Sequence, residues 1–283
     1  MTPLSPISAA SSYDQQSFWA ARFGALLFQH LELAPNLRIL DLATGTGYPL
    51  LELAQAFGAS SYVVGLDLWW EALERAEAKR LAYDQTNATL VCGNGVAMPF
   101  SDESFDLIVI HLGLNNFDKP DAVLAECARV AKHGARLVAT SNLKGHYAEF
   151  YGLFRPIIES LGNSEYVTRL GANETHRGTV EGWSAALAAA GFTVTKTVED
   201  SFIMRFLDGD TMLKHLLVRI GFLPAWENVV DEAERPRVFA EVKARLNEVA
   251  RQQGELRMNV PMVYLESRRQ GGLVEGPLAP LQL

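Results

Sequence analysis

The sequence is poor in the residues that build disulfide frameworks and metal sites. It contains only two cysteines, Cys92 and Cys127, in 283 residues, which is too few for a disulfide framework or a four-cysteine zinc site. Its six histidines include no HExxH pair or similar close spacing. We therefore expect no bound metal and a location in a reducing compartment.

Long apolar runs and positive charge are also scarce. No stretch reaches 18 consecutive apolar residues, the length that suggests a membrane-spanning helix, and the first 16 residues lack the pattern of a signal peptide. The 25 Lys and Arg residues against 33 Asp and Glu residues leave a net charge of −8, whereas nucleic-acid binders usually present a basic surface to phosphates. We expect a cytoplasmic globular protein with no membrane span and no nucleic-acid partner.

The first half of the chain alternates regularly between strand and helix patterns. Hydrophobic residues make up 48% of the sequence, enough for a sizeable core. Because apolar strands alternate with amphipathic helices, the pattern predicts a parallel sheet covered on both faces. The expected strands are 38–43, 62–68, 88–94, 105–113 and 135–142, and the expected helices are 48–57, 71–84 and 121–134, the last capped by Gly134.

The flanking segments are less regular. An amphipathic helix is expected over 13–31, and the final residues show no periodicity. In the second half we expect helices at 144–161 and 180–192, a strand at 192–206, two or three helices over 208–254 and a closing strand at 261–269.

The block Asp-Leu-Ala-Thr-Gly-Thr-Gly at residues 41–47 is the most informative motif. A strand that ends in an acid and runs through a glycine turn into a helix is typical of a site for a nucleotide-like ligand, because small residues let the backbone approach and the helix start offers unpaired N–H groups. A dinucleotide fingerprint, GxGxxG, would place its third glycine at Leu50, which is too large for that contact. The acid before the turn also fits a ligand that carries a free amino acid group.

Four segments together make the chain similar to a known family. RILDLATGTGYPLLELA (38–54), VVGLDLWWEALERA (63–76), MPFSDESFDLIVIHLGLNNF (98–117) and KPDAVLAECARVAKHGARLVATSN (119–142) resemble the motifs of class I S-adenosylmethionine-dependent methyltransferases. The resemblance is closest to the branch with the ubiquinone and menaquinone methyltransferases and covers roughly residues 36–142. It implies S-adenosyl-L-methionine as the cofactor.

The resemblance also implies roles for single residues. Asp67 would accept hydrogen bonds from both ribose hydroxyls, Leu68 would pack on the adenine, and Asn94 aligns with a position that contacts the adenine amino group. His111 and Leu112 would lie beside the sulfonium and its methyl group. The complete expected cofactor site is Asp41, Ala43, Thr44, Gly45, Gly47, Asp67, Leu68, Gly93, Asn94, Gly95, His111 and Leu112. The family most often has glycine at the position of Ala43.

The catalytic candidates are His111, His146, Tyr147 and Tyr151. A general base is needed only if the nucleophile must lose a proton, and His176 is a further candidate for it. Each has a structural alternative: His111 ends a buried strand and could be a core residue, and the two tyrosines could pack on the domain as an i, i+4 pair.

The resemblance implies a Rossmann-like, doubly wound, seven-stranded and mostly parallel sheet with a reversed last strand and a helical cap. The expected division is an N-terminal cap segment (1–35), a cofactor-binding core (36–207) with a cap insertion at about 144–175, a helical insertion (208–258), the last strand (259–270) and a tail (271–283). The 208–254 helices carry apolar residues that favour core packing, with a homodimer surface or an apolar lid as rivals.

The expected function is O- or C-methylation of a small, hydrophobic or aromatic molecule. A chain with the same motifs could instead bind S-adenosylmethionine and catalyse a cyclisation or decarboxylation, since both reactions need the bound sulfonium. A non-catalytic binding protein is the third interpretation, and it has no need for Asp41, Gly45, Gly47 and Asp67 together.

Overall fold

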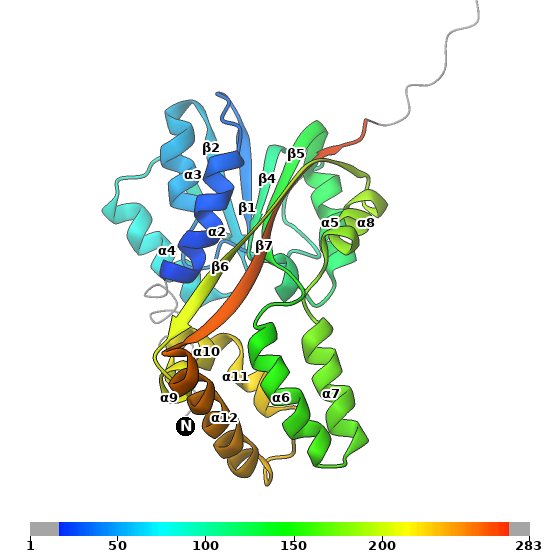
Figure 1. Cartoon of the computed structure of the whole chain (residues 1–283). Coiled ribbons are helices and arrows are strands. Elements are labelled where there is room, and N and C mark those ends of the chain that lie inside the picture. Colours follow the sequence, from blue (N-terminus) through cyan, green and yellow to red (C-terminus); the bar gives the residue numbers. More distant parts are fainter. Residues whose placement is uncertain (1–16, 272–283) are drawn as a thin grey trace, which may run out of the picture.

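A seven-stranded sheet forms the centre of the computed structural model, which describes residues 17–271 (Figure 1). The strand order is β3-β2-β1-β4-β5-β7-β6, with neighbouring strands parallel except at β7, which is antiparallel to both β5 and β6. The expected Rossmann-like sheet with a reversed last strand is therefore confirmed. The strands are β1 (Arg38–Leu42), β2 (Tyr62–Asp67), β3 (Ala88–Cys92), β4 (Phe105–His111), β5 (Ala131–Asn142), β6 (Phe192–Phe206) and β7 (Leu256–Arg269).

Helices cover both faces of the sheet because its central strands are apolar on both sides. Along β4, Leu107 and Val109 join the core on the face of α2 and α3, whereas Ile108 and Ile110 join the core with α5 and α8. This period of two is the geometry of a strand that is buried on both faces. The covering helices are α2 (Ser17–His30), α3 (Leu50–Phe57), α4 (Trp70–Ala82), α5 (Pro120–Val130) and α8 (Val180–Ala189), with short 3-10 turns η1 (Gly58–Ser60) and η2 (Leu114–Asn116).

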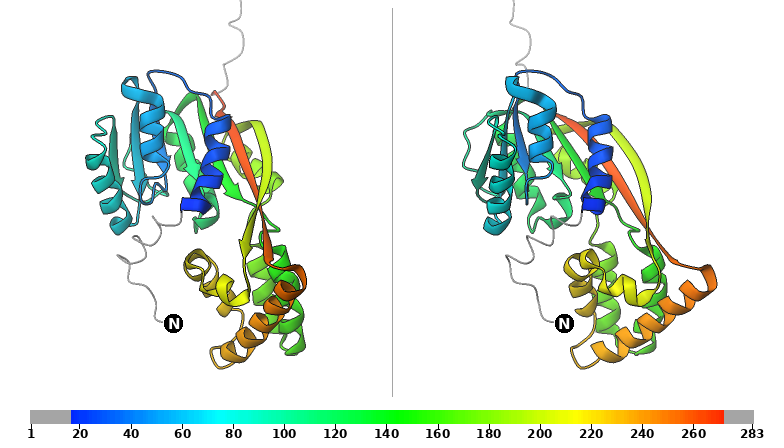
Figure 2. Two further views of the ribbon diagram at one scale, coloured as in Figure 1. Left: turned by 60° about the vertical axis from the view of Figure 1, so that its left-hand side comes forward. Right: turned by 90° about the vertical axis from the view of Figure 1, so that its left-hand side faces the viewer.

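The remaining helices form a lobe beyond one end of the sheet (Figures 1 and 2). Two insertions build this lobe, one between β5 and α8 and the other between β6 and β7. The long antiparallel pair β6–β7 runs from the sheet to the lobe. The lobe comprises α6 (Ala148–Ser160), α7 (Ser164–Thr175), α9 (Gly209–Lys214), α10 (Leu216–Gly221), α11 (Leu223–Glu227) and α12 (Arg235–Gln253).

Three sequence-based expectations were wrong in detail. The helix expected over 121–134 ends at Val130, and Gly134 does not cap it but takes φ +74 in the irregular start of β5. The segment 208–254 holds four helices, not two or three, because the helical backbone is interrupted at His215, at Phe222 and over 228–234. The last strand begins at Leu256 and not at residue 261.

Pro261 explains why that strand was expected to start late. Proline is usually confined to the start or the edge of a strand, yet here it lies inside β7 and pairs with Ser201 of β6. The ladder between β5 and β7 ends at the pair Asn142–Met262, so β7 has only β6 as a neighbouring strand at Pro261. The carbonyl of Pro261 accepts from the Leu143 N–H on the open side, where a missing N–H breaks no ladder hydrogen bond.

The N-terminal helix covers a face of the sheet rather than the strand ends. Helix α2 packs along β5 and β7 (Figure 2), and Phe23 and Leu27 are fully buried there. The expected start of this helix at residue 13, the absence of a signal peptide in 1–16 and nearly all of the expected tail lie outside the described residues. None of the helices in residues 17–271 has both the length and the apolar character that a bilayer crossing requires.

Candidate functional site

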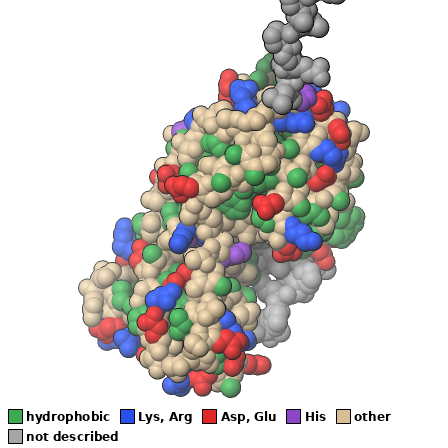
Figure 3. Space-filling model, turned by 90° about the vertical axis from the view of Figure 1, so that its right-hand side faces the viewer, with side chains coloured by type: hydrophobic (Ala, Val, Ile, Leu, Met, Phe, Trp, Pro, Cys, Tyr) green, Lys and Arg blue, Asp and Glu red, His purple; other side chains and the backbone are tan. Residues whose placement is uncertain are grey.

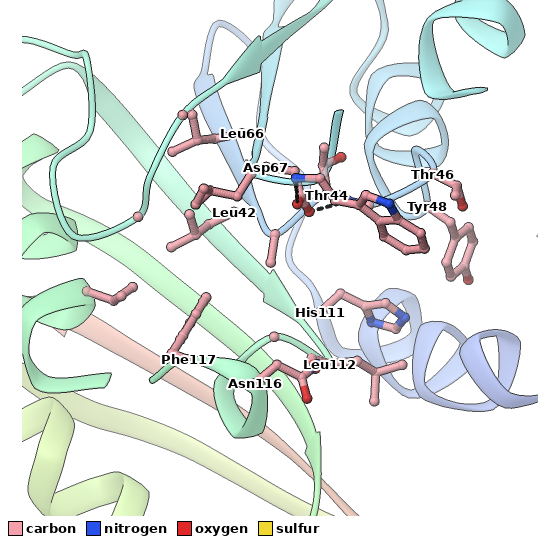
Figure 4. A pocket seen from close by; sticks show the side chains of 18 of the residues that line it. Leu42, Thr44, Thr46, Tyr48, Leu66, Asp67, His111, Leu112, Asn116 and Phe117 are labelled. Carbon is pink, nitrogen blue, oxygen red and sulfur yellow. Dashed lines mark hydrogen bonds between the residues drawn. The ribbon is translucent and has the colours of Figure 1, made fainter. Parts of the chain in front are cut away.

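A pocket of about 940 Å³ lies at the carboxyl ends of β1, β2, β3 and β4 (Figure 4). In parallel α/β sheets this edge is where ligands bind, and the volume is within the range of small-molecule sites. Most of the expected cofactor site lines it: Ala43, Thr44, Gly45, Asp67, Leu68, Gly93, Asn94, Gly95, His111 and Leu112. Asp41 and Gly47 are not part of the lining.

The turn after β1 has a left-handed backbone at three of its residues. Ala43, Gly45 and Gly47 have φ of +63°, +53° and +96°. A Cβ at Gly45 would meet nothing within 4 Å, whereas one at Gly47 would lie 3.0 Å from the Cβ of Ala76 in α4. Gly47 therefore allows close packing of α4 in addition to the turn, and Gly45 leaves open space beside the pocket. The left-handed φ of Ala43 explains why the family most often has glycine there.

Asp67 lies at the end of β2 with its carboxylate held by the backbone. One oxygen accepts from the Gly45 N–H at 2.7 Å and the other from the Trp69 N–H at 2.9 Å. Because each carboxylate oxygen can accept more than one hydrogen bond, Asp67 keeps acceptor capacity toward the pocket that it lines. The arrangement fits a ligand that presents a pair of hydroxyls.

Asp41 is buried beneath the turn. The Thr44 hydroxyl donates to its Oδ2 at 2.6 Å, while Oδ1 is buried with no hydrogen-bond partner in the described part of the chain. Burial raises the pKa of Asp41 to about 7, the Thr44 hydrogen bond opposes this, and the negative charge of Asp67 adds to it. Asp41 therefore titrates around neutral pH, and a positively charged ligand in the neighbouring pocket would favour its ionised form.

His111 is the last residue of β4 and Leu112 follows it, and both face the same pocket from the other side (Figure 4). The Nδ1 atom of His111 lies 2.8 Å from the Oγ1 of Thr140, and its Nε2 has no partner among the described residues. Burial lowers the pKa of His111 to about 4, so the imidazole is neutral at pH 7. Leu112 has φ +61°, an uncommon backbone conformation for a non-glycine residue.

Tyr48 is a pocket residue that the sequence reasoning missed. Its ring meets that of His111 edge-on at 5.3 Å between centroids, and its hydroxyl rests on the backbone of α2, since a Cβ at Gly24 would lie 1.7 Å from that oxygen. Its position directly after the glycine turn is the signal that could have revealed it. Ala20 and Ala21 of α2 and Asn116 and Phe117 after β4 also line the pocket and were not expected.

The other three catalytic candidates do not line this pocket. His146 and Tyr147 are buried at the start of α6, where their rings stack 4.0 Å apart, and the Tyr147 hydroxyl donates to the Met204 sulfur at 3.0 Å. Tyr151 accepts from the Trp226 indole N–H at 3.1 Å in the lobe. His111 alone of the four faces the pocket.

The similarity to known proteins is strongest in the first half of the chain. Residues 40–139 match the model of the family described as "Methyltransferase domain". A demethylmenaquinone methyltransferase from Lactococcus lactis is 36% identical over 132 residues, which are 47% of this chain and 51% of that protein. The chain thus aligns with about half the length of this curated relative.

Two solved structures share the fold at low sequence identity. The YcgJ protein from Bacillus subtilis has a TM-score of 0.59 and 16% identity, over 89% of this chain and all of that one. The [4+2]-cyclase SpnF has a TM-score of 0.54 and 18% identity, over 89% of this chain and 81% of that one. At these identities the likeness concerns the fold alone.

The family match implies S-adenosyl-L-methionine as the cofactor, and the residues present fit it. The unpartnered Oδ1 of Asp41, the open space at Gly45 and the acceptor capacity of Asp67 suit a cation that carries a ribose. Within residues 17–271, no group of three or more His, Cys, Asp or Glu side chains could hold a metal ion. Residues 40–139 are therefore similar to a methyltransferase domain, and relatives that match this part of the chain are named demethylmenaquinone methyltransferases.

Proposed function

We propose that the chain transfers the methyl group of S-adenosyl-L-methionine to a small apolar or aromatic molecule, at oxygen or carbon. The observation that carries this proposal is that the pocket lies within the part of the chain that matches the methyltransferase domain, at the ends of strands β1 to β4. The name of the curated relative makes a quinone-like ring one candidate for the acceptor.

The residues present would divide the work between holding the cofactor and orienting the acceptor. When bound, S-adenosyl-L-methionine supplies a methyl group already activated on a sulfonium. Asp67 and the turn around Gly45 would hold the cofactor, and its positive charge would favour the ionised form of the neighbouring Asp41, whose pKa is otherwise about 7. The protein then has mainly to align the acceptor and exclude water.

His111 is best suited to orienting the acceptor. A general base works best with a pKa near the working pH, and burial holds the pKa of His111 at about 4. A neutral imidazole whose Nε2 has no hydrogen bond of normal geometry can still exchange one with a hydroxyl or carbonyl, and the backbone of Ala20 also approaches the ring. We therefore propose His111 and the adjoining Tyr48 as the residues that face the acceptor.

The cofactor assignment is tested by calorimetric titration of S-adenosyl-L-methionine into the wild type and the Asp67→Ala variant. Loss of hydrogen bonds to a charged group should weaken binding by roughly 2–3 kcal/mol, about 30- to 150-fold in Kd. Asp121→Ala, an exposed position at the start of α5, is the control and should bind as the wild type does. An unchanged Kd for Asp67→Ala would contradict the assignment.

A second reaction class uses the same fold. The [4+2]-cyclase SpnF shares the fold, and a bound sulfonium could also serve a cyclisation or decarboxylation here. Mass spectrometry of the product separates the two: a gain of one methylene unit supports methyl transfer, whereas an isomer or the loss of carbon dioxide supports the rival.

A further inference from the structure

A second group of polar side chains lies where the sheet meets the lobe, outside the pocket lining. We call His146, Tyr151 and Arg177, with the rings of Phe222 and Trp226, the waist cluster. His146 lies on the segment from β5 into α6, and Arg177 on the segment from α7 to α8, both of which cross between sheet and lobe (Figure 1). Figure 3 shows this junction as a narrowing of the surface between sheet and lobe, with a histidine side chain exposed there.

The polar groups are gathered around one aromatic ring. The His146 ring lies 4.8 Å from the Phe222 ring, and the Arg177 guanidinium lies 5.7 Å from the centroid of the same ring. Phe222 in turn stacks at 5.9 Å on Trp226, whose indole N–H donates to the Tyr151 oxygen. The waist cluster therefore combines flat aromatic surfaces with hydrogen-bonding groups.

Buried polar atoms in this cluster lack hydrogen-bond partners. Both ring nitrogens of His146 and the Nε of Arg177 are buried without a partner in residues 17–271. Among the described residues no carboxylate forms an ion pair with Arg177 and no group accepts the Tyr151 hydroxyl proton. The carboxylate of Glu174 acts on Tyr151 by its charge but is paired with Arg155. A half-buried guanidinium without a counter-ion is costly, because a desolvated charge is normally paired.

The charges in the cluster are biased to one sign. Burial lowers the pKa of His146 well below its ordinary value, and the positive charge of Arg177 lowers it further. His146 is therefore neutral, and Arg177 is the charged group that a ligand would meet. Arginine has five N–H donors and no acceptor, so the missing partner has the chemistry of an anionic oxygen group.

We propose that the waist cluster is the substrate's anion subsite, in which Arg177, with Tyr151 and His146, binds an anionic oxygen group carried on an aromatic ring. The inference rests on the proposed function, because it names the substrate class for the same reaction. The cluster adjoins the pocket in two places. The Trp19 ring, 5.5 Å from His146, directly precedes pocket residue Ala20, and the Gly178 N–H donates to Asn115 at 3.2 Å, next to pocket residue Asn116.

The test compares 2-naphthoate with 2-naphthamide, which have nearly the same shape but differ in charge, by calorimetric titration. Wild-type protein should bind the carboxylate at least 10-fold more tightly than the amide. Arg177→Gln should lose this preference without change in the Kd of the amide. Arg237→Gln, an exposed arginine of α12 that pairs with Glu234, is the matched control and should keep the preference.

Two further variants separate a binding role from a structural one. Arg177→Lys retains the charge and should keep part of the preference for the carboxylate. Tyr151→Phe retains the ring and should weaken 2-naphthoate binding about 3- to 10-fold, the scale of one hydrogen bond to a charged group. Circular dichroism establishes that each variant is folded.

Equal affinities for the two probes, a preference that survives in Arg177→Gln, or no saturable binding of either probe would overturn the subsite. Titration of S-adenosylhomocysteine into the same proteins keeps the two proposals distinguishable. If the cofactor product fails to bind while the preference for the carboxylate is intact, the proposed function fails and the subsite stands. If the cofactor product binds and the preference is absent, only the subsite fails.

Discussion

The pocket end of the sheet and the helical lobe position their polar groups by different means. At the pocket, backbone N–H groups hold the Asp67 carboxylate, and the strand ends and the glycine turn define where it lies. In the lobe, polar groups are positioned by packing between rings from distant parts of the chain. Phe150 of α6, for example, stacks on Trp226 of α11 with 3.9 Å between centroids. Groups positioned by local backbone can be predicted from a motif, whereas groups positioned by packing between distant segments cannot.

The largest expected effect concerns the ring packing of the lobe. Phe150 is fully buried, so Phe150→Ala should lower the free energy of unfolding by about 3–5 kcal/mol. Denaturant titration followed by tryptophan fluorescence measures this. Phe18→Ala, at a ring that is 57% exposed, is the control and should cost at most about 1 kcal/mol. A second unfolding transition would show that the lobe unfolds separately, and a loss as small as the control's would contradict the role of packing.

At the pocket end, the buried carboxyl of Asp41 should make the free energy of unfolding depend on pH. Because the pKa of Asp41 is raised from 3.8 to about 7, the folded protein keeps a proton between pH 4 and 7 that the unfolded chain has released. The stabilising contribution of Asp41 is therefore present at low pH and is lost as pH rises through this window. Asp41→Asn does not titrate, so relative to wild type it should gain roughly 2–4 kcal/mol between pH 4 and 8.

The wild type must be compared with Asp41→Asn because His111 also changes its protonation in this pH range. Its folded pKa of about 4 lies below the ordinary 6.5, so it destabilises the protein as pH falls from 6.5 to 4, opposite to the effect of Asp41. The wild-type profile alone combines the two effects, and the difference between wild type and Asp41→Asn isolates Asp41. Denaturant unfolding at several pH values measures it, and a difference that does not vary with pH would contradict the raised pKa.

The smallest expected effect concerns the backbone strain in the turn after β1. Ala43 has φ +63°, where glycine is free of the strain that a Cβ causes, so Ala43→Gly should raise the free energy of unfolding by about 0.5–1 kcal/mol. The same substitution at Ala188, an exposed position in helix α8, should lower it by about 1 kcal/mol. Equal signs for the two variants would show that the left-handed conformation carries no strain.

Most of the sheet could be predicted because its signals are local. The expected strands at 62–68 and 192–206 agree with the structure to within one residue. The first residues of β7 were missed because only the tertiary context reveals that Pro261 faces a side without a ladder. The ten expected cofactor residues that line the pocket lie at strand ends or in the turns that follow them. Nothing local signals that His146 packs against Phe222, since 76 residues separate them and only the folded lobe brings them together.

The construction of the lobe from two insertions has a consequence for changing the acceptor. Because Phe150 belongs to one insertion and Trp226 to the other, neither can be exchanged alone without leaving a ring that has lost its stacking partner. Grafting a new specificity onto this sheet would require both insertions to be transplanted as a matched pair. We therefore expect changes of sequence in the two insertions to be coupled, because each supplies one ring of the stacked pair.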